Sequence, residues 1–209
     1  MEAVCLIGVD GAGKTSIARR MAGILRERGV RVRVAWLRGT HTLASLAARL
    51  LHALGARGDC NPYYHVCVPE RLRGAWAWLE AASIIPVIAG RFKAPGLLGY
   101  TVIGDRGPLD LIVWIRLTLG MDTRGTLLER LIIAVSRATC RSVYVRASLE
   151  ALLSRRRGTR DERLIPAELQ AYDELAARLK LPVIDTTSTT VEEAAKTILE
   201  EVGWCTRVV

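Results

Sequence analysis

Side-chain amides are almost absent from this chain of 209 residues, since Asn61 and Gln170 are the only two. Lysine is scarce as well, because only four of the 30 basic residues are lysines. Depletion of thermolabile amides is typical of proteins from thermophiles, whereas a GC-rich genome would also explain the excess of arginine over lysine. From this composition we expect a thermophilic source.

Long apolar runs are also missing. The most apolar stretch, residues 81–90, is too short to span a membrane and contains Pro86. No signal peptide precedes the first apolar segment, which directly follows Met1 and Glu2. These features predict a cytoplasmic protein that has no membrane partner.

The cysteines do not form a metal-binding pattern. None of the five belongs to a C-x-x-C pair, and none has a histidine at a zinc-finger spacing. Cys60 and Cys67 are close enough in the sequence for a disulfide, which does occur inside hyperthermophiles. Buried free thiols are the simpler expectation for all five cysteines.

The net charge of +9 is compatible with two kinds of surface. A basic protein favours polyanionic partners such as phosphates or nucleic acid. Alternatively, the arginines lie on solvated helix faces. Because the sequence contains no DNA- or RNA-binding motif, we do not expect nucleic acid to be the main partner.

Short apolar strands alternate with longer helical patterns along the whole chain. The expected strands are residues 3–9, 30–36, 100–105, 142–146 and 182–185. Between strands, apolar residues recur at helical spacing, as at Ile17, Met21 and Ile24. Strands separated by helices imply right-handed crossovers and a parallel sheet covered on both faces. The sequence therefore predicts one α/β domain over residues 1–209.

Three local features of the helices and loops can be predicted. A helical segment over residues 69–92 should kink or break at Pro86. Residues 59–62 (DCNP) have the composition of a loop. The last helix should begin after Thr190, with Glu193 completing a capping box.

The stretch GVDGAGKT, residues 8–15, matches the phosphate-loop pattern G-x-x-x-x-G-K-[ST] between a predicted strand and a predicted helix. In such a loop, backbone N–H groups surround phosphate oxygens. Lys14 would reach the β- and γ-phosphates, and the Thr15 hydroxyl would ligate Mg²⁺. The expected nucleotide cradle consists of Gly8, Asp10, Gly11, Ala12, Gly13, Lys14, Thr15 and Ser16. ATP and Mg²⁺ are the predicted cofactors.

Other motifs narrow the class of phosphate-loop protein. The chain has no NKxD-like motif, which switch GTPases need to read the guanine base. None of its strands ends in Asp-Glu, as a motor ATPase would usually require. Instead, the strand in TVIGDRG ends with Asp105 and Arg106.

With these motifs the chain resembles the thymidylate kinase family of nucleoside monophosphate kinases. The similar stretches are GVDGAGKT, VIGDRG (102–107), SRRRGTRDERL (154–164) and VIDTT (183–187), in that order. The resemblance implies a three-layer α/β phosphate-loop kinase fold with a five-stranded parallel sheet and helices on both faces. It also implies a short basic lid over about residues 154–165.

The resemblance assigns roles to these residues in transfer of the ATP γ-phosphoryl group to a nucleoside monophosphate, with dTMP as the expected acceptor. Asp105 would orient Mg²⁺ or its waters, and Arg106 would bridge the acceptor phosphate and the transferred group. Asp10 would contact the acceptor sugar or position its neighbours. Lid arginines would surround the triphosphate, and the set of expected catalytic residues is Lys14, Arg106, Asp105, Asp10, Arg155 and Arg160.

The acceptor motifs depart from the family. Only Arg38 matches the Arg-Glu-Pro triplet that contacts the acceptor, and apolar Ile84 and Ile85 stand where an arginine usually reads thymine. Three alternatives therefore stay open beside dTMP phosphorylation. The acceptor is a nucleoside, or it is another small hydroxyl or phosphate compound, or the protein binds nucleotide or nucleic acid without turnover. Family members are often homodimers, so a second copy is a possible partner.

Overall fold

The structure is a computed structural model that describes residues 3–37, 42–61, 65–159 and 162–204, with backbone only for residues 59 and 60. Five parallel strands form one sheet in the order β2–β4–β1–β5–β6. They are β1 (Ala3–Ile7), β2 (Val32–Trp36), β4 (Thr101–Asp105), β5 (Arg141–Arg146) and β6 (Val183–Asp185). The five-stranded parallel sheet predicted from the sequence is thereby confirmed.

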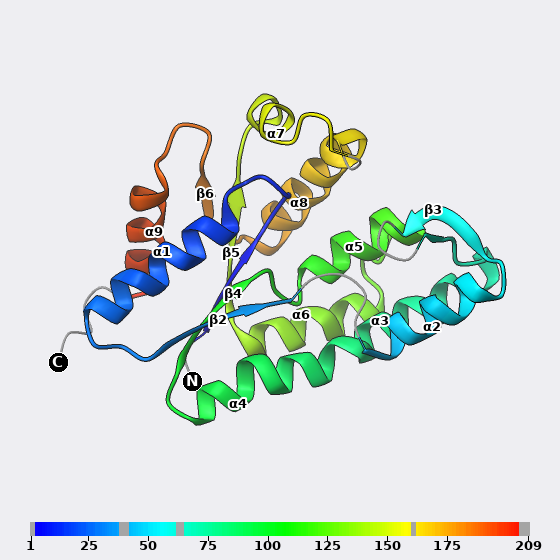
Figure 1. Cartoon of the computed structure of the whole chain (residues 1–209), viewed down its shortest axis with the longest axis horizontal. Coiled ribbons are helices and arrows are strands. Elements are labelled where there is room, and N and C mark those ends of the chain that lie inside the picture. The colour runs from blue at the N-terminus through cyan, green and yellow to red at the C-terminus, as the bar shows by residue number, and fades with distance from the viewer. Residues whose placement is uncertain (1–2, 38–41, 62–64, 160–161, 205–209) are drawn as a thin grey trace.

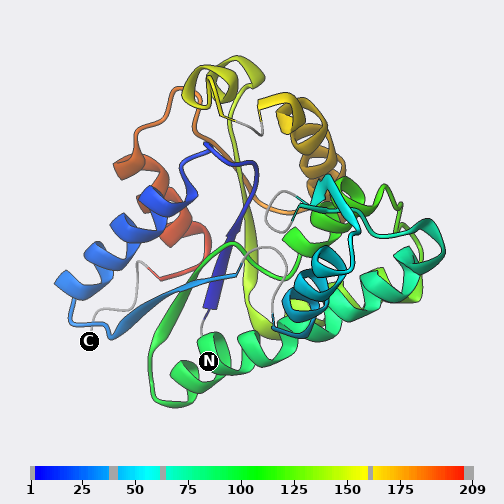
Figure 2. The ribbon, with the colours of Figure 1, turned by 45° about the vertical axis from the view of Figure 1, so that its right-hand side comes forward.

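Helices cover both faces of this sheet (Figures 1 and 2). On one face, α1 (Lys14–Glu27) packs beside α9 (Val191–Glu201). The other face is covered by α5 (Asp110–Leu119), α6 (Leu127–Thr139) and the long helix that precedes β4. At the carboxyl ends of the strands, α7 (Leu149–Arg155) is followed by α8 (Ile165–Leu179), with a 3₁₀ turn at Glu162–Leu164 between them. The capping box of α9 is present at Thr190 and Glu193, as predicted.

The burial of each strand matches its place in the sheet. Every residue of the central strand β1 is buried, because helices cover both of its sides. In the edge strand β2, Val32 and Ala35 are buried, whereas Arg33, Val34 and Trp36 are exposed. The alternating segment at residues 30–36 therefore lies at a sheet edge, as its pattern predicts.

A region of α2 (Thr42–Ala53), the short strand β3 (Arg57–Asn61) and a long helical run projects beyond the sheet. The prediction of a loop over 59–62 was wrong for residues 59–61, because β3 forms antiparallel bridges with Val66 at Arg57 and Asn61. This local pairing uses residues that propensity alone assigns to a turn.

The long helical run passes through Pro86 without ending there, so of the predicted kink or break the break does not occur. A 3₁₀ turn (Glu70–Leu72) leads into α3 (Arg73–Ile88), a π-helical turn (Ala89–Lys93) and α4 (Ala94–Leu97). Pro86 supplies no N–H, and the π-helical turn follows within one turn of it.

Among the described residues, one helical run, Glu70–Leu97, is long and apolar enough to cross a membrane by length and composition. A third of its most apolar window is buried, and α3 contacts α2, α5 and α6. Core helices of soluble proteins meet the same criterion, so this run is weak evidence for a membrane span.

The cysteines differ from the expectation of free thiols. Cys5 in β1 and Cys140 before β5 form a disulfide whose Cα atoms are 5.8 Å apart. Cys67 is also disulfide-bonded. The alternative of a Cys60–Cys67 disulfide cannot be followed, because the Cys60 side chain lies outside the described residues. Sequence spacing did not indicate the Cys5–Cys140 bridge, since its partners are 135 residues apart.

Candidate active site

A cleft of about 340 Å³ opens at the carboxyl ends of β1, β2 and β4. Parallel strands end at the same edge of a sheet, and this edge is where α/β proteins bind ligands. Trp36 and Asp105 end neighbouring strands in register, so their side chains share one face. The lining residues are Asp10, Gly11, Gly13, Lys14, Thr15, Ser16, Trp36, Asp105 and Arg106.

The phosphate loop needs its glycines. Gly8, Gly11 and Gly13 have φ angles of 140°, 94° and 91°, which other residues rarely adopt. A Cβ at Gly8 would lie 2.3 Å from the carbonyl oxygen of Val145, so a side chain there would collide with β5. Gly13 caps α1 without a side-chain hydrogen bond, which leaves the first amides of this 14-residue helix available for an anion. The loop therefore fits the phosphates of a nucleotide.

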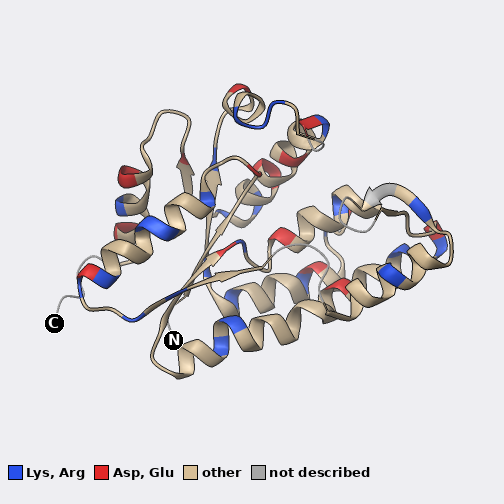
Figure 3. Cartoon of the chain, in the orientation of Figure 1, with Lys and Arg blue, Asp and Glu red and all other residues tan. Residues whose placement is uncertain are grey.

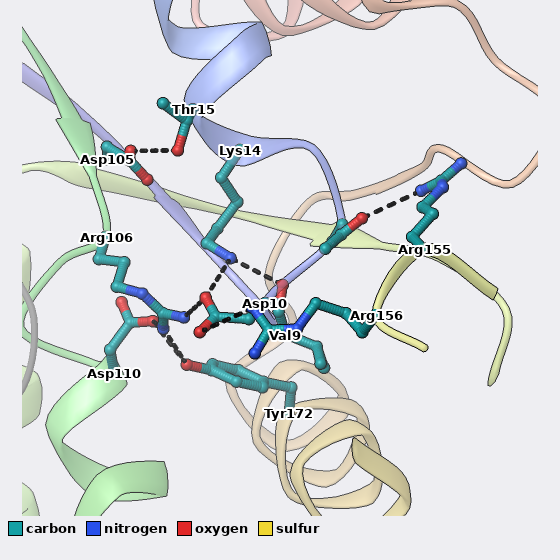
Figure 4. Close-up of polar contacts among 12 residues, drawn as sticks. Val9, Asp10, Lys14, Thr15, Asp105, Arg106, Asp110, Arg155, Arg156 and Tyr172 are labelled. Atoms are coloured by element: carbon teal, nitrogen blue, oxygen red, sulfur yellow. Dashed lines mark hydrogen bonds and ion pairs between the residues drawn. The ribbon is translucent and has the colours of Figure 1, made fainter. Parts of the chain in front are cut away.

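Lys14 lies across this loop. Its Nζ donates a hydrogen bond to the Val9 carbonyl at 2.7 Å and is 3.9 Å from Asp10 Oδ1 (Figure 4). Burial, together with the nearby Arg106 guanidinium, lowers the pKa of Lys14 to about 8. A triphosphate would oppose this shift, because it stabilises the protonated amine.

Thr15 and Asp105 converge at the start of α1. The Thr15 hydroxyl donates a hydrogen bond to Asp105 Oδ2 at 2.6 Å, although the two residues are 90 positions apart. A hydroxyl beside a carboxylate, next to a phosphate cradle, suits Mg²⁺, which favours one or two protein oxygens plus water and phosphate. Within the described ranges, no group of three or more His, Cys, Asp or Glu side chains forms a cage for a metal. These two residues therefore fit Mg²⁺ bound together with a nucleotide.

Arg106 is buried at the centre of a polar cluster. Its Nη1 donates hydrogen bonds to Asp110 Oδ1 at 2.8 Å and to the Tyr172 hydroxyl at 3.0 Å. Its Nη2 pairs with Asp10 on the phosphate loop (Figure 4). The guanidinium thus links β4 with the loop and with α8, and it can contact two anionic oxygens at once.

Asp110 and Tyr172 were not identified from the sequence. The Tyr172 hydroxyl donates to Asp110 Oδ1 at 2.6 Å, and Asp110 Oδ2 accepts from the Gly107 amide at 2.7 Å. Burial, followed by the Asp110 charge, raises the pKa of Tyr172 above its usual value, so the phenol stays protonated and can donate. Asp110 lies one helical turn after Arg106, which is a local signal, but Tyr172 is 66 residues away from Arg106.

Two lid arginines reach the phosphate loop in different ways. Arg155 donates to the backbone oxygens of Gly11 at 3.2 Å and of Thr186 at 3.0 Å. Arg156, which belongs to the predicted basic lid but not to the set of expected catalytic residues, has Nη1 3.8 Å from Asp10 Oδ2 and packs its Cγ against Gly11. Figure 3 shows the basic residues grouped along the chain that follows α7. Arg156 therefore lies close to Asp10, the predicted acceptor contact.

The predicted acceptor side is only partly within the described residues. Arg38, like Arg160 of the lid, lies outside them. At the positions where an arginine was expected to read thymine, Ile84 is buried, whereas Ile85 is exposed.

Solved structures resemble this fold. The thymidylate kinase of Candida albicans is 15% identical, has a TM-score of 0.59, and covers 97% of this chain and 91% of its own. The thymidylate kinase of Ehrlichia chaffeensis is also 15% identical, has a TM-score of 0.58, and covers 97% of this chain and 98% of its own. No protein-family model and no curated protein matches the chain. The chain has the thymidylate kinase fold, with phosphate loop, central sheet and surrounding helices.

Proposed function

We propose that the protein is a nucleoside monophosphate kinase that transfers the ATP γ-phosphoryl group to dTMP. The observation that carries this proposal is the convergence of Lys14, Asp105 and Arg106 on one cleft at the carboxyl edge of the sheet. Phosphoryl transfer requires positive charge and alignment rather than a protein nucleophile. We treat residues 1–209 as one kinase domain with a lid over about 154–165, acting in the cytoplasm.

The donor side follows from the phosphate loop. Loop amides and Lys14 would hold the triphosphate, and Arg155 and Arg156 would close over it from the lid. Thr15 would ligate Mg²⁺ and Asp105 would orient its waters, and the bound ion neutralises phosphate charge during transfer. Lid closure would also exclude water, which competes with the acceptor for the phosphoryl group.

The acceptor side follows from Arg106 and Asp10. Arg106 would leave part of its contact with Asp10 to bridge the acceptor phosphate, and Asp10 would then face the acceptor sugar. Asp110 and Tyr172 would hold the guanidinium in place through this change, because both bond its other nitrogen. Transfer is thus supported by a charged group already ordered before the substrate arrives.

Apolar residues at 84 and 85 favour a second acceptor class, because no arginine stands there to bond a thymine carbonyl. Under this alternative the kinase mechanism is unchanged and the acceptor is a nucleoside or another small phosphate or hydroxyl compound. The thymidylate kinase of Candida albicans, which shares this fold, is itself described as having broad substrate specificity. A test of the function must therefore include more acceptors than dTMP.

The experiment is a transfer assay with Mg²⁺-ATP and dTMP, dUMP, UMP, CMP, AMP, GMP and the matching nucleosides. We expect dTDP as the main product, and Arg106→Ala should abolish most of it. Preference for another acceptor would replace dTMP and keep the kinase assignment. ATP binding with no transfer to any acceptor would contradict the kinase proposal.

We further propose that the kinase forms a homodimer through α3. Ala75, Trp78, Ala82, Ile85 and Ala89 recur every three or four residues on its exposed side. Between Arg73 and Arg91 the only charged residue is Glu80, which is buried. A face of alternating large and small apolar residues is complementary to itself, so two antiparallel copies can interdigitate.

Sedimentation velocity tests this dimer. Trp78→Glu should shift the protein to monomers, because two charges would be desolvated at the twofold axis. The control is Val183→Glu, which places the same charge at an exposed apolar residue on β6. A monomeric wild type, or equal dissociation by both variants, would contradict the α3 interface.

A further inference from the structure

We propose that the Cys5–Cys140 disulfide positions Asp105 and Arg106, so that its reduction slows phosphoryl transfer. The proposal rests on the kinase function for one of its two readouts. Its other readout, amide exchange, is independent of any activity.

The disulfide lies under the turn that follows β4. Cys5 is fully buried in the central strand, where it pairs in register with Gly104 of β4 and Ser142 of β5. Cys140, which ends α6, is also buried. The bridge therefore ties the middle of the sheet to the start of β5 at the place where the chain leaves β4.

Two glycines bring this turn into contact with the sulfur atoms. A Cβ built on Gly107 would lie 2.7 Å from Cys5 Cβ, 3.0 Å from Cys5 Sγ and 3.7 Å from Cys140 Sγ. A Cβ on Gly104 would lie 3.0 Å from Cys5 Sγ. Asp105 and Arg106 are the two residues between these glycines. The backbone that carries both side chains is therefore packed against the disulfide at each end.

The turn needs this support because Arg106 has a φ angle of 78°. For a residue with a Cβ, this left-handed conformation is unfavourable, so its surroundings must hold it. The Arg106 amide donates to the Leu6 carbonyl at 3.0 Å, and the Gly107 amide donates to Asp110 Oδ2 at 2.7 Å. Leu6 follows Cys5 directly, so the disulfide and this hydrogen bond fix the same part of β1.

Reduction would break the S–S bond and form two thiols, with two electrons and two protons supplied by a dithiol that becomes a cyclic disulfide. The two sulfurs, no longer bonded, must move apart. The turn at Gly104 and Gly107, which lies against these sulfur atoms, would have to give way. Cys140 also lines a cleft of about 290 Å³ with Arg137 and Arg141, which offers a small thiolate a cationic route to this bond.

The test compares the oxidised enzyme, the dithiol-reduced enzyme and Cys5→Ala/Cys140→Ala, with alkylation and mass measurement to establish the thiol state. We expect kcat to fall about 10- to 100-fold without the bond, because a small misplacement near the reacting groups costs that much. The KM for ATP should change less than about twofold, since the phosphate loop keeps its own contacts. Exchange of the Arg106 and Gly107 amides should become faster.

Two controls separate positioning from a general loss of stability. Ile198→Ala removes a buried side chain of α9, and it should lower Tm without lowering kcat at a temperature where it is folded. Cys67→Ala, reduced in parallel, accounts for the other disulfide-bonded cysteine. Unchanged kcat and unchanged amide exchange in the folded, reduced enzyme would overturn the proposal, as would an equal loss of kcat in Ile198→Ala. If the oxidised enzyme transfers no phosphoryl group to any acceptor, the kinase proposal fails, and amide exchange alone decides whether the disulfide positions the turn.

Discussion

The surroundings of the phosphate loop and the region of α2 and α3 are built in contrasting ways. On the donor side, at the phosphate loop, buried charged residues are bonded to polar partners, as in the contacts of Lys14 with the Val9 carbonyl and of Asp105 with Thr15. On the side of α2 and α3, long stretches carry no charge, and Leu43, Leu46 and Leu50 are exposed. Figure 3 shows the same contrast between the nearly uncharged α3 and the charged ends of the sheet strands.

The two regions therefore differ in how strictly their residues fix a geometry. Buried and fully bonded charges hold one geometry, because each would be costly to leave unpaired. Apolar helix faces hold shape and permit substitution without loss of the fold. Under the proposed function, the donor side would define the reaction, and the region of α2 and α3 would be where acceptor choice and assembly vary.

The strongest test of the donor side is Lys14→Ala. Phosphoryl transfer should fall about 10³-fold, because the variant removes the cation that we propose contacts the β- and γ-phosphates. The measurement is kcat/KM with the preferred acceptor, together with ATP affinity.

Lys14→Arg is the matched control, because it keeps the positive charge and replaces the ammonium group by a guanidinium. It should recover only part of the transfer rate that Lys14→Ala loses. Transfer by Lys14→Ala at the wild-type rate would mean that the phosphate loop does not hold the donor. The contrast between the phosphate-loop side and the region of α2 and α3 would then have no role in the reaction.

The next test compares neighbouring lid arginines. Arg156→Ala should lower kcat about 10- to 100-fold, because this residue lies near Asp10 and would stabilise charge in the transition state. Arg155→Ala should have a smaller effect of about threefold, because its guanidinium bonds backbone oxygens. Exposed Arg157 provides the matched control, and Arg157→Ala should leave kcat unchanged within about twofold. A larger loss from Arg155→Ala than from Arg156→Ala would reverse the assignment.

The lowered pKa of Lys14 predicts that ATP binding takes up a proton in alkaline solution. Above about pH 8 the free enzyme has lost the Lys14 proton, and bound phosphate raises this pKa by favouring the charged amine. Affinity should therefore fall as pH rises, by up to about tenfold per pH unit between the free and bound pKa values. Calorimetry at about pH 9 in buffers of different ionisation enthalpy measures the proton uptake. Lys14→Arg should bind ATP without it, and a wild type with no uptake would contradict the assigned pKa.

Local patterns predicted the sheet and the donor side because they act over short distances. The phosphate loop requires glycines at fixed offsets, and Asp105 and Arg106 stand at the end of a recognisable strand. Tyr172 and Cys140 depend on tertiary packing over many residues, so no spacing in the sequence indicated their partners. Pro86 shows the same limit from the opposite direction, because packing around α3 maintains a helix that the local rule ends.

The smallest expected effect tests the region of α2 and α3, where Ser83 joins the two helices. Its buried hydroxyl accepts a hydrogen bond from the Ala44 amide at 2.9 Å, in the first turn of α2. Ser83→Ala should cost about 1 to 2 kcal/mol, because it leaves this buried amide without its partner. In a domain of this size the loss lowers Tm by roughly 3 to 6 °C.

Ser136→Ala, which removes a buried hydroxyl at the end of α6, is the matched control for stability. If α2 and α3 shape the acceptor site, only Ser83→Ala should raise the acceptor KM, by about two- to threefold, with the KM for ATP unchanged. Equal kinetics in the two variants would mean that the contact between α2 and α3 stabilises the fold and does not shape the acceptor site.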